Sequence, residues 1–176
     1  MAESLPVFTI GHSTRTIPEF ATLLQAGGVR CVVDIRHFAR SRTNPQYNQD
    51  RLPDELAPYQ IGHLWIEALG GRRKKSDLPP ALNGFWNNAS FHNYADYALS
   101  PAFQAGLDRL LAVSAQQRTA IMCAEALWWR CHRRIVADYL IHAGRTVYHL
   151  MGKDNVVPAT LTEAAVPAGP SLHYPG

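Results

Sequence analysis

The sequence is poor in cysteine, in net charge and in long apolar runs. Only 3 of its 176 residues are cysteine, and this odd, sparse set argues against a secreted disulfide scaffold and for reduced thiols. No stretch approaches the roughly 20 apolar residues of a membrane span. Residues 1–6 lack the basic and apolar regions of a secretory signal. We therefore expect a cytoplasmic protein without a membrane partner.

The common cofactor motifs are also missing. Residues 11–13, Gly-His-Ser, form neither a Walker loop nor a dinucleotide fingerprint. Cys123, Glu125, Cys131 and His132 include residue types that zinc prefers, but seven residues separate the two cysteines. Usual zinc motifs place such ligands roughly two to four residues apart. The sequence predicts no cofactor, with a metal site as an alternative.

Apolar runs that fit strands alternate with helical patterns along the chain. The expected strands cover residues 7–10, 29–35, 63–68, 119–123 and 146–150, and helices are expected to begin after Thr16 and Ser100. This alternation predicts a single-domain α/β fold with a mostly parallel, five-stranded, doubly wound (Rossmann-like) sheet and helices on both faces. We assign the domain to residues 1–152. A proline-containing tail over 153–176 is expected to pack on it or extend from it.

Polar residues follow four of the expected strands. Because ligands bind at the carboxyl ends of strands in open α/β sheets, we expect one site that gathers Gly11, His12, Ser13, Asp34, Arg36, Glu67, Gly71, Cys123 and Glu125. Residues 72–91 contain a basic run and two adjacent prolines. They are expected to form a long loop beside that site.

Cys123 is the candidate nucleophile, since a thiol at a strand end, close to a helix start, has the setting of a reactive thiolate. The alternative is a buried, inert cysteine. Glu125, His132 and His12 are candidates for proton transfer, although each histidine could equally be a hydrogen-bonded loop residue. Cys131 fits the apolar face of the following helix and is expected in the core, as is Cys31.

Several basic residues near these positions are candidates for anion binding. Guanidinium groups can hold phosphate or carboxylate through paired hydrogen bonds, and the candidates, with the Ser13 hydroxyl, are Arg36, Arg40, Arg42, Arg130 and Arg133. Asp34 and Arg36 could instead form an internal network that stiffens their loop. The expected partner is an anionic small molecule or nucleic acid. Aromatic residues near the basic run favour nucleic acid, because bases stack on aromatic rings. The oligomeric state is left open.

Six motifs together resemble the family called domain of unknown function 488. They are Thr-Ile-Gly-His-Ser at 9–13, Val-Asp-Ile-Arg at 33–36, Arg-Ser-Arg at 40–42 with Asn-Pro at 44–45, Leu-Gly-Gly at 69–71, Met-Cys-Ala-Glu at 122–125 and Cys-His-Arg at 131–133. The resemblance implies a compact prokaryotic α/β protein whose motifs meet at one site. It implies no reaction. The chain departs from the family's pattern at residues 126–129, where paired tryptophans form a stacking platform or local core.

A fainter likeness is to rhodaneses and thiol phosphatases, whose loop returns an arginine six residues after the cysteine. Here that position is Trp129, and Arg130 comes one residue later. The leading hypothesis is a thiol-dependent enzyme acting on a phosphate-bearing or nucleic-acid-related substrate. The alternatives are a non-catalytic nucleotide or nucleic-acid binding module with structural cysteines, rhodanese-like sulfur transfer, or a metal site.

Overall fold

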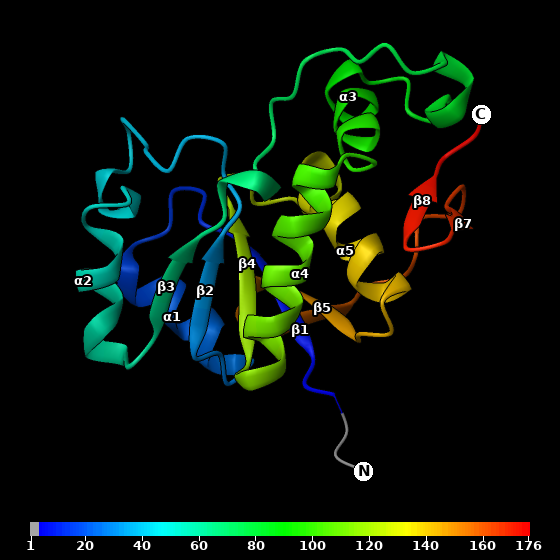
Figure 1. Ribbon diagram of the computed structural model, residues 1–176. Helices are drawn as coiled ribbons and strands as arrows, with labels where there is room; N and C mark the ends of the chain where they lie inside the picture. The colour runs from blue at the N-terminus through cyan, green and yellow to red at the C-terminus, as the bar shows by residue number, and fades with distance from the viewer. Residues whose placement is uncertain (1–3) are drawn as a thin grey trace.

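The computed structural model describes residues 4–176, and a six-stranded sheet lies at its centre (Figure 1). The strand order is β3-β2-β4-β1-β5-β6. Five strands are parallel, and their bounds are β1 Val7–Gly11, β2 Cys31–Asp34, β3 Gly62–Trp65, β4 Thr119–Cys123 and β5 Val147–Gly152. The mostly parallel α/β fold expected from the sequence is confirmed.

The sixth strand comes from the expected tail. Strand β6, Asn155–Pro158, pairs antiparallel with β5 at the edge of the sheet, so the sheet continues beyond residue 152. Farther on, β7 (Val166–Ala168) and β8 (Ser171–His173) form a separate hairpin. Tyr174 is fully buried, and its hydroxyl donates to the Asp138 carboxylate at 2.9 Å. The C-terminal segment therefore packs as part of the core.

Five α-helices cover the two faces of the sheet: α1 Ile17–Ala26, α2 Leu52–Leu56, α3 Ala89–Tyr97, α4 Pro101–Gln116 and α5 Arg133–His142. One hydrophobic cluster packs α1 and α2 against one face, through residues such as Phe20 and Leu56. A second cluster packs α3, α4 and α5 on the other face, through Tyr94, Phe103 and Ile135. Alternate strand residues supply each cluster, as a sheet buried on both faces requires.

The helix starts follow the capping signals of the sequence. Thr16 forms a complete capping box with Glu19 at the start of α1, and the Ser100 hydroxyl accepts the Phe103 amide at the start of α4. Asn88 caps α3 in the same way, by accepting the amides of Ser90 and Phe91. This helix begins inside the expected 72–91 loop, and a short 3-10 helix over Pro80–Asn83 also interrupts that loop.

Two expected boundaries were wrong. Strand β3 ends at Trp65, and Glu67 belongs to a 3-10 helix over Glu67–Leu69. Helix α5 begins at Arg133, so Cys131 precedes the helix. Within residues 4–176, every helix is too short or too polar to cross a lipid bilayer.

Candidate functional site

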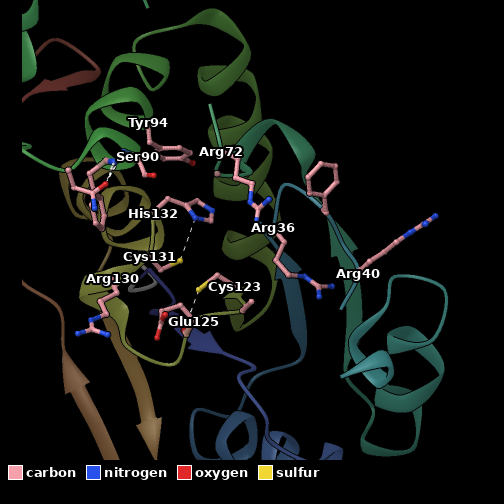
Figure 2. A pocket seen from close by; sticks show the side chains of 15 residues that line it. Arg36, Arg40, Arg72, Ser90, Tyr94, Cys123, Glu125, Arg130, Cys131 and His132 are labelled. Atoms are coloured by element: carbon pink, nitrogen blue, oxygen red, sulfur yellow. Dashed lines mark hydrogen bonds between the residues drawn. The ribbon is translucent and has the colours of Figure 1, made fainter. Parts of the chain in front are cut away.

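A cavity of about 510 Å³ opens beyond the carboxyl end of β4 (Figure 2). Its walls come from the segment after β2, the Gly71 turn, the start of α3 and the β4–α5 connection. The lining residues are Arg36, Phe38, Arg40, Gly71, Arg72, Asn88, Ser90, Phe91, Tyr94, Cys123, Ala124, Glu125, Arg130, Cys131 and His132. The fold thus brings eight of the expected site residues to one cavity.

Two thiols lie together in the wall of this cavity. Cys123 is the last residue of β4, and a 3-10 turn over Trp128–Arg130 returns the chain so that Cys131 lies beside it. Burial opposes ionisation of Cys123, whose side chain is 2% exposed, yet a hydrogen bond from Cys131 and the charge of Arg133 bring its pKa below the ordinary value. Burial, reinforced by that hydrogen bond, raises the pKa of Cys131 well above the ordinary value. Cys123 therefore ionises more readily than Cys131, and its thiol donates to the Glu125 carbonyl at 3.5 Å.

Arg133 is a fully buried cation without a carboxylate partner. Its Nη2 donates to the Ala126 carbonyl at 2.8 Å, while Nε and Nη1 have no hydrogen-bond partner among the described residues. No salt bridge to Arg133 is found within residues 4–176. A buried guanidinium remains charged and needs a compensating anion. The positive charge of Arg133 is one of the causes that lower the pKa of the nearby Cys123 thiol.

His132 has one ring nitrogen fixed by the fold and the other directed at the thiols. Its Nε2 lies 2.6 Å from the Ile35 carbonyl oxygen, so Nε2 must carry the proton and donate it. Its Nδ1 is then an acceptor, 3.4 Å from the Cys131 sulfur. Burial lowers the pKa of His132 to about 4, which keeps the ring neutral near pH 7.

His12 does not reach the cavity. Its Nδ1 donates to the Ser13 carbonyl at 2.9 Å, and its Nε2 accepts from Arg36 at 3.3 Å. The ring stacks on Tyr47 at a centroid distance of 4.3 Å, and burial lowers the His12 pKa to about 4. Both ring nitrogens are used inside the protein, so the structure gives His12 a packing role.

Asp34 and Arg36 form the internal network that the sequence offered as an alternative to anion binding. Arg36 pairs with the Asp34 carboxylate at 2.6 Å and also donates to the Tyr47 carbonyl. Asp34 lies behind the cavity wall and does not line it. Arg36 lines the cavity, but most of its donors are already engaged.

The glycines of the site allow close contact between backbone segments. A Cβ on Gly11 would overlap the Glu125 carbonyl, and one on Gly71 would lie 3.0 Å from Nδ1 of His132. The Ser13 amide donates to the Ala124 carbonyl at 3.0 Å. Gly11 and Ser13 therefore support the Cys123 loop from below, and neither lines the cavity.

Three exposed arginines surround the opening: Arg40, Arg72 and Arg130. None of them makes a salt bridge within the described residues, so their charges are available to an anion. Arg42 is exposed outside the cavity, as is Glu67. Glu125 is exposed at the cavity edge, where its carboxylate accepts the Leu127 amide at 3.2 Å.

Sequence reasoning missed the residues that α3 and the segment after β2 contribute. They are Phe38, Asn88, Ser90, Phe91 and Tyr94, and the other two lining residues that were not expected are Arg72 and Ala124. The Asn88 cap was the one signal that could have located α3. Of the paired tryptophans, Trp128 stacks on His149 at 4.4 Å, and Trp129 is 45% exposed. Among the described side chains, no three histidine, cysteine or acidic groups are arranged to hold a metal ion.

Comparison with known proteins gives one match. The model of the family described as domain of unknown function DUF488 matches residues 16–140, which include the whole cavity lining. Searches of curated proteins and of solved structures find no match.

Proposed function

This chain belongs to the family of domain of unknown function DUF488, and we propose that it is a thiol-dependent enzyme acting on phosphate-bearing compounds. One observation carries the proposal. The Cys123 thiol lies beside a buried guanidinium that lacks a carboxylate, and it borders a cavity that exposed arginines surround. A thiolate is stabilised from within the protein, and an anionic substrate is attracted from outside.

The chemistry that fits this arrangement is phosphoryl transfer. Arg72 holds the phosphate group above the thiol, and Arg40 and Arg130 add positive charge at the rim of the cavity. The Cys123 sulfur attacks phosphorus, an S–P bond forms, and the bond from phosphorus to the leaving oxygen breaks. The leaving oxygen takes its proton from water. Water then attacks phosphorus, which releases phosphate and a proton and restores the thiolate.

The neighbouring side chains have supporting roles in this proposal. Cys131 stays protonated and donates to the Cys123 thiolate, since burial and the hydrogen bond raise its pKa. His132 is the alternative acceptor for the Cys131 proton, because Ile35 fixes the histidine proton on Nε2 and Nδ1 lies 3.4 Å from the Cys131 sulfur. Arg133 is a positioning residue that balances the thiolate charge. None of these three needs to touch the substrate.

The test combines hydrolysis of p-nitrophenyl phosphate with alkylation of thiols by iodoacetamide. Wild-type protein is expected to hydrolyse the ester, and Cys123→Ser to lose at least about 100-fold in rate. Cys31→Ser is the matched control, because Cys31 is also a buried cysteine and lies outside the cavity. Inorganic phosphate should slow alkylation of Cys123. Equal hydrolysis by wild type and Cys123→Ser would overturn the proposal.

A non-catalytic phosphate-binding module is the second candidate. It is favoured by the arginines around the cavity and by Phe38, whose side chain is 61% exposed at its edge. This function predicts that phosphate compounds bind wild type and Cys123→Ser equally and that neither protein turns them over. Rhodanese-like sulfur transfer is tested in the same assay series, with thiosulfate as donor and the persulfide of Cys123 detected by mass spectrometry.

A further inference from the structure

A second cavity, of about 650 Å³, adjoins the first. The side chain of Arg72 lines both cavities. Phe38 lines the first cavity, and its sequence neighbour His37 lines the second. The two cavities therefore meet along one short stretch of surface, formed by Arg72 and residues 37–38.

The combined surface is basic. Arg73 and Lys74 line the second cavity, and Arg40, Arg72 and Arg130 line the first. Glu125 and Asp96 are the carboxylates that line the two cavities. Asp96 is already satisfied, since it accepts from Asn83 at 2.7 Å and from Ser76 at 2.5 Å. The excess of positive charge indicates an anion that extends over both cavities.

The junction also offers an aromatic ring. Phe38 contacts the His37 ring edge-on at 4.6 Å, and the Arg72 guanidinium lies 5.8 Å from its centroid. Much of the ring remains open to solvent, since Phe38 is 61% exposed. An exposed phenyl ring beside a guanidinium is a suitable stacking partner for a base.

We propose that the two cavities together bind single-stranded nucleic acid. One phosphate lies in the first cavity, near Cys123, and another lies near Lys74 in the second. A base between them stacks on Phe38. This inference rests on the proposed function, because it names the substrate class of the same site. Cationic grooves that alternate with exposed aromatic rings are typical of proteins that bind single strands.

Binding is measured by fluorescence anisotropy with a fluorescein-labelled oligothymidylate of about twelve nucleotides, within the usual range for such sites. The comparison ligands are a duplex of the same length and thymidine monophosphate as competitor. The single strand is expected to bind more tightly than either. Phe38→Ala should weaken its binding roughly 5- to 100-fold, as loss of base stacking does, and Phe38→Trp should restore it.

Lys74→Gln tests the second cavity. It should weaken binding of the oligonucleotide and lower the slope of log affinity against log salt by about 0.7, the value for one phosphate contact on a single strand. Binding of the monophosphate should be unchanged. Arg30→Gln is the matched control, since it removes an exposed charge that lies outside both cavities.

The inference is overturned if the duplex binds more tightly than the single strand, or if Phe38→Ala and Lys74→Gln bind as wild type does. Its failure differs from failure of the proposed function. Tight binding of the single strand without p-nitrophenyl phosphate hydrolysis would leave the inference standing and remove the phosphoryl transfer. Hydrolysis of p-nitrophenyl phosphate without preference for the oligonucleotide would support the phosphoryl transfer and overturn the inference.

Discussion

Arg36 and Arg133 are both buried arginines near the same cavity, and they differ in what surrounds their charge. Arg36 has a full set of partners, with the Asp34 carboxylate at 2.6 Å, the Tyr47 carbonyl and the His12 ring. Arg133 makes one hydrogen bond, to Ala126, and leaves two nitrogens without a partner among the described residues. The first arginine is neutralised by a carboxylate within the fold, while the second has no carboxylate partner among the described residues.

The histidines beside these arginines show the same contrast. His12 uses both ring nitrogens within the packed region around Arg36. His132 uses one nitrogen on Ile35 and presents the other to Cys131 at the cavity. A satisfied polar group supports structure, and a polar group with unused capacity beside a cavity is a candidate for function.

The largest effect is expected when the Arg36 region is broken. Arg36→Met leaves the Asp34 carboxylate buried without its cation, which costs about 3–5 kcal/mol in the free energy of unfolding. Arg51→Met is the control, because the Arg51–Glu55 pair is exposed and such pairs contribute about 0–1 kcal/mol. Urea denaturation measures both. A similar loss in the two variants would show that the Arg36 network is not a stabilising unit.

The next largest loss of stability is expected at Gly11, where β1 packs against the loop that follows Cys123. Gly11→Ala places a methyl group against the Glu125 backbone, and overpacking of this kind costs about 1–3 kcal/mol. We expect the upper end of that range, since a backbone segment must move. Gly62→Ala is the control, because its Cβ would lie 3.7 Å from the nearest heavy atom, the Arg30 carbonyl oxygen. Thermal or urea unfolding of both variants tests whether the Cys123 loop depends on this contact.

The histidines give a dependence of stability on pH. Burial lowers the pKa of His12 and of His132 to about 4, whereas an unfolded histidine titrates near its ordinary pKa. The unfolded state therefore takes up protons first as the pH falls, and stability is lost between the ordinary pKa and about 4. Each histidine should cost about 2 kcal/mol between pH 7 and pH 5.

Urea denaturation at the two pH values tests this in wild type, His12→Gln and His132→Gln. Each variant should lose its own share of the pH dependence, whatever its stability at pH 7. An unchanged pH dependence in His132→Gln would mean that this ring keeps its ordinary pKa in the folded protein, and the neutral, buried ring inferred at low pH would be wrong.

The smallest change in stability is expected at Arg133. Arg133→Met leaves no carboxylate behind, so the free energy of unfolding should change by no more than about 1 kcal/mol. The pKa of Cys123 should rise, because the neighbouring positive charge is lost. The rate of Cys123 alkylation against pH measures that shift. An alkylation profile identical to that of wild type would show that Arg133 does not lower the pKa of Cys123. Arg133 would then not differ from Arg36 in function.

The fold was largely predictable because its signals are local. The five parallel strands are apolar runs, and the helices after Thr16 and Ser100 carry capping residues that act within one turn. Strand β6 was missed because its four residues, Asn-Val-Val-Pro, carry little pattern of their own. Helix α3 was missed because its sequence alternates polar and aromatic residues without a clear apolar stripe.

The sequence by itself determined the α/β layers and placed Cys123 at the end of a strand, since hydrophobic period and capping chemistry depend on neighbours along the chain. Only the tertiary structure decided which arginine is paired, which histidine is enclosed and which aromatic rings reach the cavity. These properties arise from contacts between segments far apart in sequence. Asp34 and Arg36 are two residues apart, so their ion pair could be predicted from the sequence. The lack of a partner for Arg133 depends on every segment that surrounds it and is seen only in the tertiary structure.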